Sequence, residues 1–304
     1  MYVNTDFILL WKNQIIKTNI FYFLAVIVVL VTVVCVYLLT AYKNKKNQPK
    51  EESDPFAAPS GFDKKKGKLG NLTEKSYSSK TTGTTQKCYV YTPPGYKANK
   101  VYPVMYLLHG INGTHTEWKD NGNPDRILSN LINACDAKRM IVVMPNVRFM
   151  NPNIVPSDVY GTANVNAFNN FFNELKNDLM PFIEKEYKVS KERTGRAIAG
   201  LSMGGMESLN IGISMPETFG FIGAFSAAPS LPFSAEQMKL PDEYKNNTFI
   251  MICCGLEDGL LSFSQDYNKS LTDNGVQTTY YTIRGGHDFG VWKNGLYNFA
   301  KRIF

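Results

Sequence analysis

The stretch that most constrains the fold of this chain is residues 197–205, with the sequence A-I-A-G-L-S-M-G-G. It begins as a small apolar run, which predicts a buried strand. It then turns through Ser202 and enters a helical pattern over residues 206–213. A strand, a sharp turn and a helix, with G-x-S-x-G on the turn, predict a strained elbow that exposes a nucleophilic serine. The pattern alone also occurs in ordinary glycine-rich turns, so its context must decide.

The residues that flank the serine fit such an elbow. Side chains at Gly200 and Gly204 would collide with the neighbouring strand and helix, because the turn is so tight. The Met203 N–H would lie at the N-terminus of the helix, where it can bind a developing oxyanion.

The chain around this elbow alternates strand and helix patterns. Apolar runs predict strands, and apolar residues at helical spacing predict helices. The expected strands are 88–91, 102–108, 140–144, 221–225, 249–253 and 280–283, and the expected helices are 127–134, 168–187, 263–272 and 292–303. This alternation predicts an α/β fold with a mostly parallel, doubly wound sheet. With the elbow, it indicates the α/β-hydrolase fold.

Composition divides the chain into four parts. Residues 1–19 form a short N-terminal segment. Residues 20–42 are almost entirely apolar and predict a transmembrane anchor, because about 20 apolar residues span a bilayer. A cleavable signal peptide is the alternative, although the run is long for one and lacks a good cleavage site. Residues 43–80 predict a flexible basic linker, and residues 81–304 the catalytic domain.

The net charge of +7 is not spread evenly. Residues 41–80 carry ten lysines against five acidic residues, so the catalytic region is nearly neutral. The catalytic region therefore lacks the excess of positive charge that is typical of nucleic-acid-binding proteins. The chain has five cysteines and three histidines, with no C-x-x-C and no Cys/His metal spacing. We therefore expect no disulfide framework, no metal and no organic cofactor.

The order of the remaining polar residues predicts a serine-hydrolase triad. In α/β-hydrolases the triad runs Ser, then Asp or Glu, then His, each on a loop after a strand. His287 is the only histidine that follows Ser202 and is the predicted base. Asp258 is the predicted acid, because it lies late on its turn and precedes a glycine. Glu257 is the alternative and would otherwise be a solvated charge, while Asp288 is too near His287 in sequence.

The second oxyanion donor should come from a loop after an early strand. Gly110 follows the apolar run 102–108 and lets the backbone approach the nucleophile, so the Ile111 N–H is the predicted donor. His109 could act as a base, but a structural histidine bonded to neighbouring backbone is the preferred interpretation.

Five motifs occur in an order that resembles a known family. They are Y-L-L-H-G-I-N-G at 106–113, R-A-I-A-G-L-S-M-G-G at 196–205, F-S-A-A-P-S at 225–230, C-G-L-E-D at 254–258 and G-G-H-D-F-G-V-W at 285–292. Together they resemble the putative-esterase family, carbohydrate esterase family 1, and most of all the feruloyl esterase domains attached to bacterial xylanases. The resemblance covers roughly residues 75–304.

The resemblance implies roles for individual residues. Ser202, Asp258 and His287 would be the triad, and the amides of Ile111 and Met203 the oxyanion hole. Trp292 follows the histidine loop and either lines the acyl pocket or packs in the core. The chain departs from the family pattern at Glu257, where an asparagine is usual, and this adds a charge near the site.

These observations predict a serine carboxylic-ester hydrolase that releases ferulate or related hydroxycinnamates from plant cell-wall arabinoxylan through an acyl-enzyme. The alternatives are an acetyl-xylan esterase, a thioesterase of the S-formylglutathione hydrolase type and a surface acyltransferase. The expected partner is a feruloylated or acetylated xylan-type polysaccharide. Because such a polymer cannot cross a membrane, we expect a single-pass, N-in/C-out anchor with an extracellular catalytic domain, although lysines after the apolar run favour the opposite orientation.

Overall fold

The computed structural model describes residues 32–36, 38–40, 54–149, 158, 161–229 and 238–304. The chain divides into two compact units, Met1–Pro55 and Phe56–Phe304. In the first unit the described residues 32–36 and 38–40 are helical.

The predicted membrane anchor over residues 20–42 is not supported. Residues 20–31, 37, 41 and 42 lie outside the described residues. Among the residues that are described, no helix has both the length and the apolar character needed to cross a bilayer. This finding contradicts the expected single-pass anchor and the extracellular location inferred from it.

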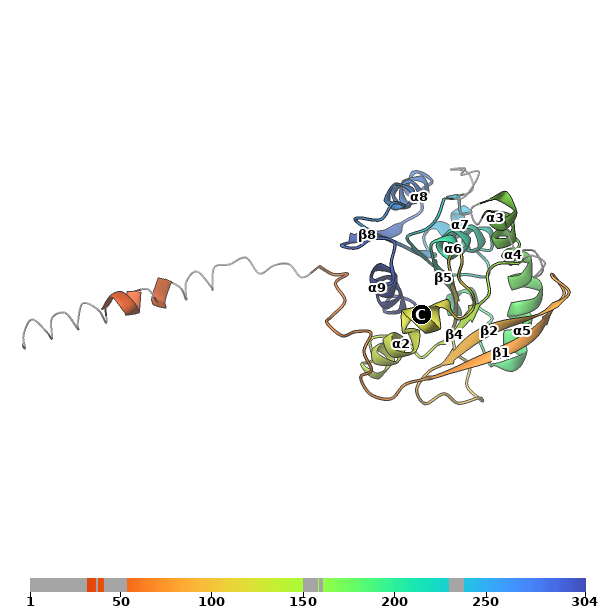
Figure 1. The fold of residues 1–304 in the computed structure, drawn as a ribbon, viewed down its shortest axis with the longest axis horizontal. Helices are drawn as coiled ribbons and strands as arrows, with labels where there is room; N and C mark the ends of the chain where they lie inside the picture. The colour runs from red at the N-terminus through yellow and green to blue at the C-terminus, as the bar shows by residue number, and fades with distance from the viewer. Residues whose placement is uncertain (1–31, 37, 41–53, 150–157, 159–160, 230–237) are drawn as a thin grey trace, which may run out of the picture. The chain divides into compact units, whose positions relative to one another are not determined.

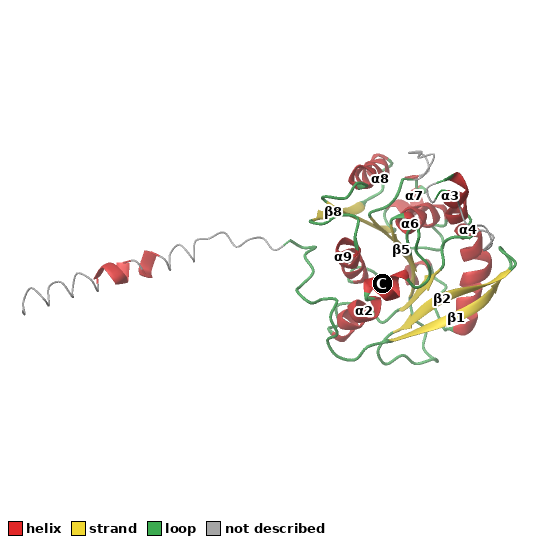
Figure 2. Ribbon diagram, viewed as in Figure 1, coloured by secondary structure: helices red, strands yellow, loops and turns green. Residues whose placement is uncertain are grey.

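The second unit is built on one eight-stranded sheet. Its strands, in the order in which they lie side by side, are β1 (Asn71–Ser79), β2 (Thr84–Thr92), β4 (Ile141–Pro145), β3 (Val104–Leu108), β5 (Arg196–Leu201), β6 (Phe221–Phe225), β7 (Phe249–Gly255) and β8 (Thr278–Ile283). All neighbours from β4 to β8 pair in parallel, and β1 and β2 form an antiparallel hairpin at one edge (Figures 1 and 2). The mostly parallel sheet confirms the predicted fold class.

Helices cover both faces of this sheet. They are α2 (Pro124–Asn133), α3 (Thr162–Asn169), α4 (Phe171–Glu174), α5 (Met180–Glu186), α6 (Met203–Ser214), α7 (Asp242–Lys245), α8 (Leu261–Asp273) and α9 (Phe289–Ala300), with short π-helical or 3-10 turns at Trp118–Gly122, Leu175–Leu179 and Arg193–Gly195. Helices α2 and α9 pack on one face, and α5, α6 and α8 pack on the other (Figure 1).

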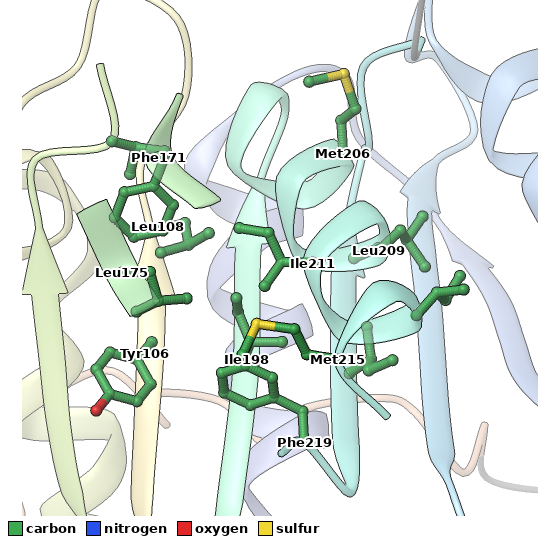
Figure 3. Close-up of a cluster of buried hydrophobic side chains, with 14 of the residues drawn as sticks. Tyr106, Leu108, Phe171, Leu175, Ile198, Met206, Leu209, Ile211, Met215 and Phe219 are labelled. Atoms are coloured by element: carbon green, nitrogen blue, oxygen red, sulfur yellow. The ribbon is translucent and has the colours of Figure 1, made fainter. Parts of the chain in front are cut away.

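The central strands explain why two layers are needed. Every residue of β3, β4 and β5 is buried, as expected of parallel strands that are covered on both sides. Successive side chains point to opposite faces, so Tyr106 and Leu108 of β3 pack toward α6, whereas Met105 and Leu107 pack toward α2 and α9. Figure 3 shows the α6 side of this core.

The structure differs from the predicted single helix at 168–187. That stretch is interrupted by the π-helical turn Leu175–Leu179 between α4 and α5. The turn coincides with two inward-facing acids. Glu174 accepts a hydrogen bond from the Ser79 hydroxyl at 2.6 Å, and Asp178 accepts from the Lys80 and Thr81 N–H groups at 3.0 Å. An extra residue in a turn shifts the side chains around the axis, and here it accompanies the contact with the end of β1.

The folded unit also begins earlier than the predicted residue 81. Strand β1 pairs along its whole length with β2, and Phe56 stacks on Tyr281 with ring centroids 4.0 Å apart. The side-chain amides of Asn294 and Asn298 donate to the Phe56 carbonyl. A segment that is polar in composition is therefore part of the domain, because its few apolar residues and its backbone have specific partners.

Candidate active site

Ser202 lies on the sharp turn between β5 and α6. Its backbone angles, φ 52° and ψ −119°, are strained for a residue that is not glycine. A Cβ at Gly200 would lie 2.5 Å from the Gly204 carbonyl oxygen, and one at Gly204 would lie 2.4 Å from the His109 carbonyl oxygen. Both glycines are therefore required by close backbone contacts, as the sequence predicts.

His287 lies on the loop between β8 and α9, beside Ser202. Its Nε2 is 3.0 Å from the Ser202 Oγ, and its Nδ1 is 2.9 Å from Oδ2 of Asp258. Residues that are 85 and 29 positions apart from His287 in sequence thus form one hydrogen-bonded chain. Parallel strands end at the same edge of the sheet, and each of the three side chains follows such a strand.

Asp258 is the buried member of this chain, on the loop after β7. Burial of its carboxyl group raises its pKa, but hydrogen bonds from the Leu260 N–H, the Ser226 hydroxyl and His287 lower it more. The pKa of Asp258 therefore lies below its ordinary value, and the carboxylate is ionised beside the imidazole. Ser226, which the sequence analysis missed, follows β6 with a positive φ of 48°.

The two other acids near His287 have different contacts. Asp288 caps α9, where its carboxylate accepts hydrogen bonds from the N–H groups of Gly290 at 2.7 Å and Val291 at 3.3 Å. Glu257 accepts a hydrogen bond from the Gly285 N–H. Glu257 is therefore not merely a solvated charge, because it ties the acid loop to the histidine loop.

The loop after β3 lies directly against the nucleophile. A Cβ at Gly110 would be 3.1 Å from the Ser202 Cβ. The Gly113 N–H donates to the Gly110 carbonyl at 3.1 Å, and Asn112 has a φ of 65°, so residues 110–113 form a tight turn. Ile111 is the second residue of this turn. Among the described residues, the N–H groups of Ile111 and Met203 have no hydrogen-bond partner.

His109 is buried behind this loop and takes no part in the hydrogen bonds that link Ser202, His287 and Asp258. Its Nδ1 is 2.8 Å from the Gly110 carbonyl oxygen, and the Val147 N–H donates to its Nε2 at 2.8 Å. Burial lowers the pKa of His109 to about 4, so the ring is neutral near pH 7. These contacts confirm the interpretation of His109 as a histidine bonded to neighbouring backbone.

Glu117 is a second residue that the sequence analysis missed. Its carboxylate accepts a hydrogen bond from the Gly110 N–H at 2.9 Å. Burial raises the pKa of Glu117, against the lowering effects of that N–H and of His287. No local pattern in the sequence predicts this contact, because it joins Glu117 to a residue seven positions earlier across the turn at 110–113.

Trp292 lies on the first turns of α9, close to His287. The two ring centroids are 4.9 Å apart and the rings meet edge to face. Only 7% of Trp292 is exposed, and among the described residues its indole N–H has no hydrogen-bond partner. The ring therefore packs in the core of the α9 layer and also adjoins the imidazole.

Comparisons with known proteins support an ester hydrolase. The family described as "Putative esterase" matches residues 79–303. An endo-1,4-beta-xylanase/feruloyl esterase of Xylanibacter ruminicola is 31% identical over 244 residues, which are 77% of this chain and 31% of that protein. The chain thus spans about a third of that relative. An acetyl esterase of Caldicellulosiruptor saccharolyticus is 23% identical over 237 residues, which cover 64% of this chain and 80% of that one.

A solved structure agrees with the family match. A CE1 ferulic acid esterase from Anaeromyces mucronatus, determined in complex with ferulic acid, has a TM-score of 0.78 and 28% sequence identity. The match covers 84% of this chain and 98% of that one, and it supports the α/β-hydrolase fold. The resemblance predicted from the five motifs is confirmed: the chain belongs to the putative-esterase family, whose carbohydrate esterase family 1 members include feruloyl esterases.

Proposed function

We propose that the chain is a serine esterase that releases ferulate or a related hydroxycinnamate from arabinoxylan. The observation that carries this proposal is the hydrogen-bonded chain from Ser202 Oγ through His287 to Asp258, with distances of 3.0 and 2.9 Å. The family, and the feruloyl esterases among its members that resemble this chain, supply the substrate class.

In the proposed reaction, Ser202 Oγ attacks the ester carbonyl while His287 Nε2 takes its proton. The imidazolium then gives that proton to the leaving sugar alkoxide, and a feruloyl group remains on Ser202. Water, deprotonated by His287, hydrolyses this acyl-enzyme and frees the acid. The Asp258 carboxylate holds Nδ1–H and stabilises the imidazolium, which agrees with its lowered pKa.

The negative charge of the tetrahedral intermediate needs donors on the other side of the carbonyl carbon. The N–H groups of Ile111 and Met203 are the proposed donors. Their support is the contact of Gly110 with Ser202, the position of Met203 as the first residue of α6, and the lack of a partner for either N–H among the described residues. Removing one such donor costs about 10²- to 10³-fold in kcat.

Trp292 is the proposed wall of the acyl site. Its ring is edge to face with His287, so an aromatic acyl group attached to Ser202 would lie within reach of it.

An acetyl-xylan esterase is the second candidate. The observation that favours it is the likeness to an acetyl esterase that extends over most of that protein. The two activities share every chemical step and differ only in the size of the acyl group that the site accepts.

A panel of esters would test the proposal with the full chain. We expect methyl ferulate and feruloylated arabinoxylan to be hydrolysed with a higher kcat/KM than acetylated xylan or an S-acyl glutathione. Ser202→Ala, as control, should lose about 10³-fold or more in kcat on every substrate. A preference for acetylated xylan would favour the acetyl esterase, and hydrolysis of the thioester alone would refute the proposal.

A further inference from the structure

We propose that His109 is a positioning residue for the reaction, because its imidazole fixes the peptide group whose N–H belongs to Ile111. The inference rests on the proposed function, in which that N–H stabilises the oxyanion. Until this point His109 has only a structural role at the end of β3. The argument depends on which nitrogen of the ring carries the proton, and on the geometry of one peptide bond.

The backbone partners of His109 decide its tautomer. The Val147 N–H can only donate, so Nε2 must be the acceptor in that 2.8 Å contact. The Gly110 carbonyl can only accept, so Nδ1 must carry the proton of this 2.8 Å hydrogen bond. A third neighbour, the Asn146 Oδ1, is 3.1 Å from Nε2, but the Asn146 side chain has partners of its own in the N–H and carbonyl groups of Arg148, so the two backbone contacts of the ring decide the tautomer. The ring is therefore the Nδ1–H tautomer.

The same carbonyl belongs to the peptide group between Gly110 and Ile111. This group is planar and trans, so its C=O and N–H point in opposite directions. By holding the oxygen on one side, the His109 ring directs the Ile111 N–H to the other side, away from itself. The Gly113 N–H holds the oxygen as well, at 3.1 Å, but it belongs to the same turn, whereas the His109 side chain comes from the residue that follows β3. The ring is also bonded to the Val147 N–H, which follows β4, and this contact adds to its support.

The surroundings of the ring make it a firm support. His109 is 1% exposed and meets the Phe168 ring edge to face, with centroids 6.0 Å apart. Its lowered pKa keeps it neutral near pH 7, so the hydrogen-bond pattern does not change over the working range of an esterase. Donation to the Gly110 oxygen also polarises the peptide, which makes the Ile111 N–H a better donor to an oxyanion.

Two substitutions separate this positioning role from space filling. His109→Asn places an amide nitrogen near the position of Nδ1, so the donor to Gly110 is kept and the partner of Val147 is lost. His109→Gln places its amide near the position of Nε2, so the Val147 contact is kept and the donor to Gly110 is lost. The two variants are thus matched controls for each other.

The experiment measures kcat and KM of the full chain on methyl ferulate, affinity for a trifluoromethyl ketone analogue of the tetrahedral intermediate, and Tm. We expect His109→Gln to lower kcat about tenfold to a hundredfold with KM nearly unchanged, and to weaken the analogue by a similar factor. His109→Asn should keep kcat within about threefold. Equal kcat losses in the two variants, or wild-type kcat in His109→Gln, would overturn the inference while leaving the proposed function intact.

A measurement on the wild-type chain decides the case even if a variant fails to fold. In a ¹⁵N-labelled sample near pH 7, the His109 ring should show a protonated Nδ1 and an unprotonated Nε2. An unprotonated Nδ1 would overturn the inference. If the wild-type chain hydrolyses none of the esters, the proposed function fails, whatever the state of this ring.

Discussion

Glu207 of α6 is a buried acid whose removal should stabilise the protein in a pH-dependent way. Glu207 is 2% exposed, and among the described residues its Oε1 has no hydrogen-bond partner. Burial alone raises its pKa from 4.5 to about 8. The folded chain therefore holds a proton on Glu207 near pH 7 that the unfolded chain has released.

The size of the effect follows from these two pKa values. Because the pKa is higher in the folded state, the stability that Glu207 permits is complete below pH 4.5 and is lost as the pH rises toward 8. pH 7 lies 2.5 units above 4.5, and each unit lowers the free energy of unfolding by about 1.4 kcal/mol. The loss at pH 7 therefore amounts to about 3 kcal/mol. Glu207→Gln is neutral at every pH and should remove this loss.

Urea denaturation at intervals from pH 5 to pH 8 would measure it. The free energy of unfolding of wild type should fall by about 3 to 4 kcal/mol relative to Glu207→Gln across that range. Glu217→Gln, which changes an exposed acid just after the same helix, is the control and should follow the wild-type curve. Parallel curves for wild type and Glu207→Gln would show that Glu207 is ionised in the folded protein and would refute the reasoning.

Three further predictions concern the site. Asp258→Asn should lower kcat by about 10³- to 10⁴-fold, whereas Glu257→Gln should change it only a fewfold, because glutamine still accepts from the Gly285 N–H; the reverse ranking on methyl ferulate would move the acid to Glu257. Gly204→Ala should lower the urea midpoint by an amount equivalent to about 1 to 3 kcal/mol, since its methyl group would meet backbone oxygens at 2.4 and 2.7 Å, and an unchanged midpoint would contradict that clash. Trp292→Ala should raise KM for methyl ferulate more than for an acetyl ester, and equal effects on both would leave Trp292 as core packing alone.

The local patterns of the sequence were sufficient for the layers of the fold and for the elbow. The short apolar runs of β3, β4 and β5 predict strands covered on both faces, and every residue of these strands is buried. Ser202 was found from a turn whose glycines are required by close contacts. His287 and Asp258 were found from strand order, since each follows a parallel strand. Their distances to one another agree with that argument, and their catalytic roles stay predictions.

The features that the sequence did not reveal depend on contacts between distant segments. Strand β1 buries only Tyr77 and Ser79 and exposes polar residues elsewhere, so its composition is that of a linker. The membrane anchor was predicted from hydropathy alone, and the described helical residues do not support it. Ser226 and Glu117 act on Asp258 and Gly110 only because separate loops meet in space. Neither side chain stands in a pattern that marks it beforehand.

The central claim is that Ser202 carries the acyl group during turnover. The test mixes the full chain rapidly with an activated feruloyl ester, quenches the reaction with acid and analyses the digest by mass spectrometry. Acylation by such a substrate is faster than deacylation, so the acyl-enzyme accumulates. We expect one feruloyl group on the peptide that contains Ser202, formed and lost at rates consistent with kcat, and no adduct in Ser202→Ala. An adduct on another residue, or turnover by Ser202→Ala at the wild-type rate, would contradict the account.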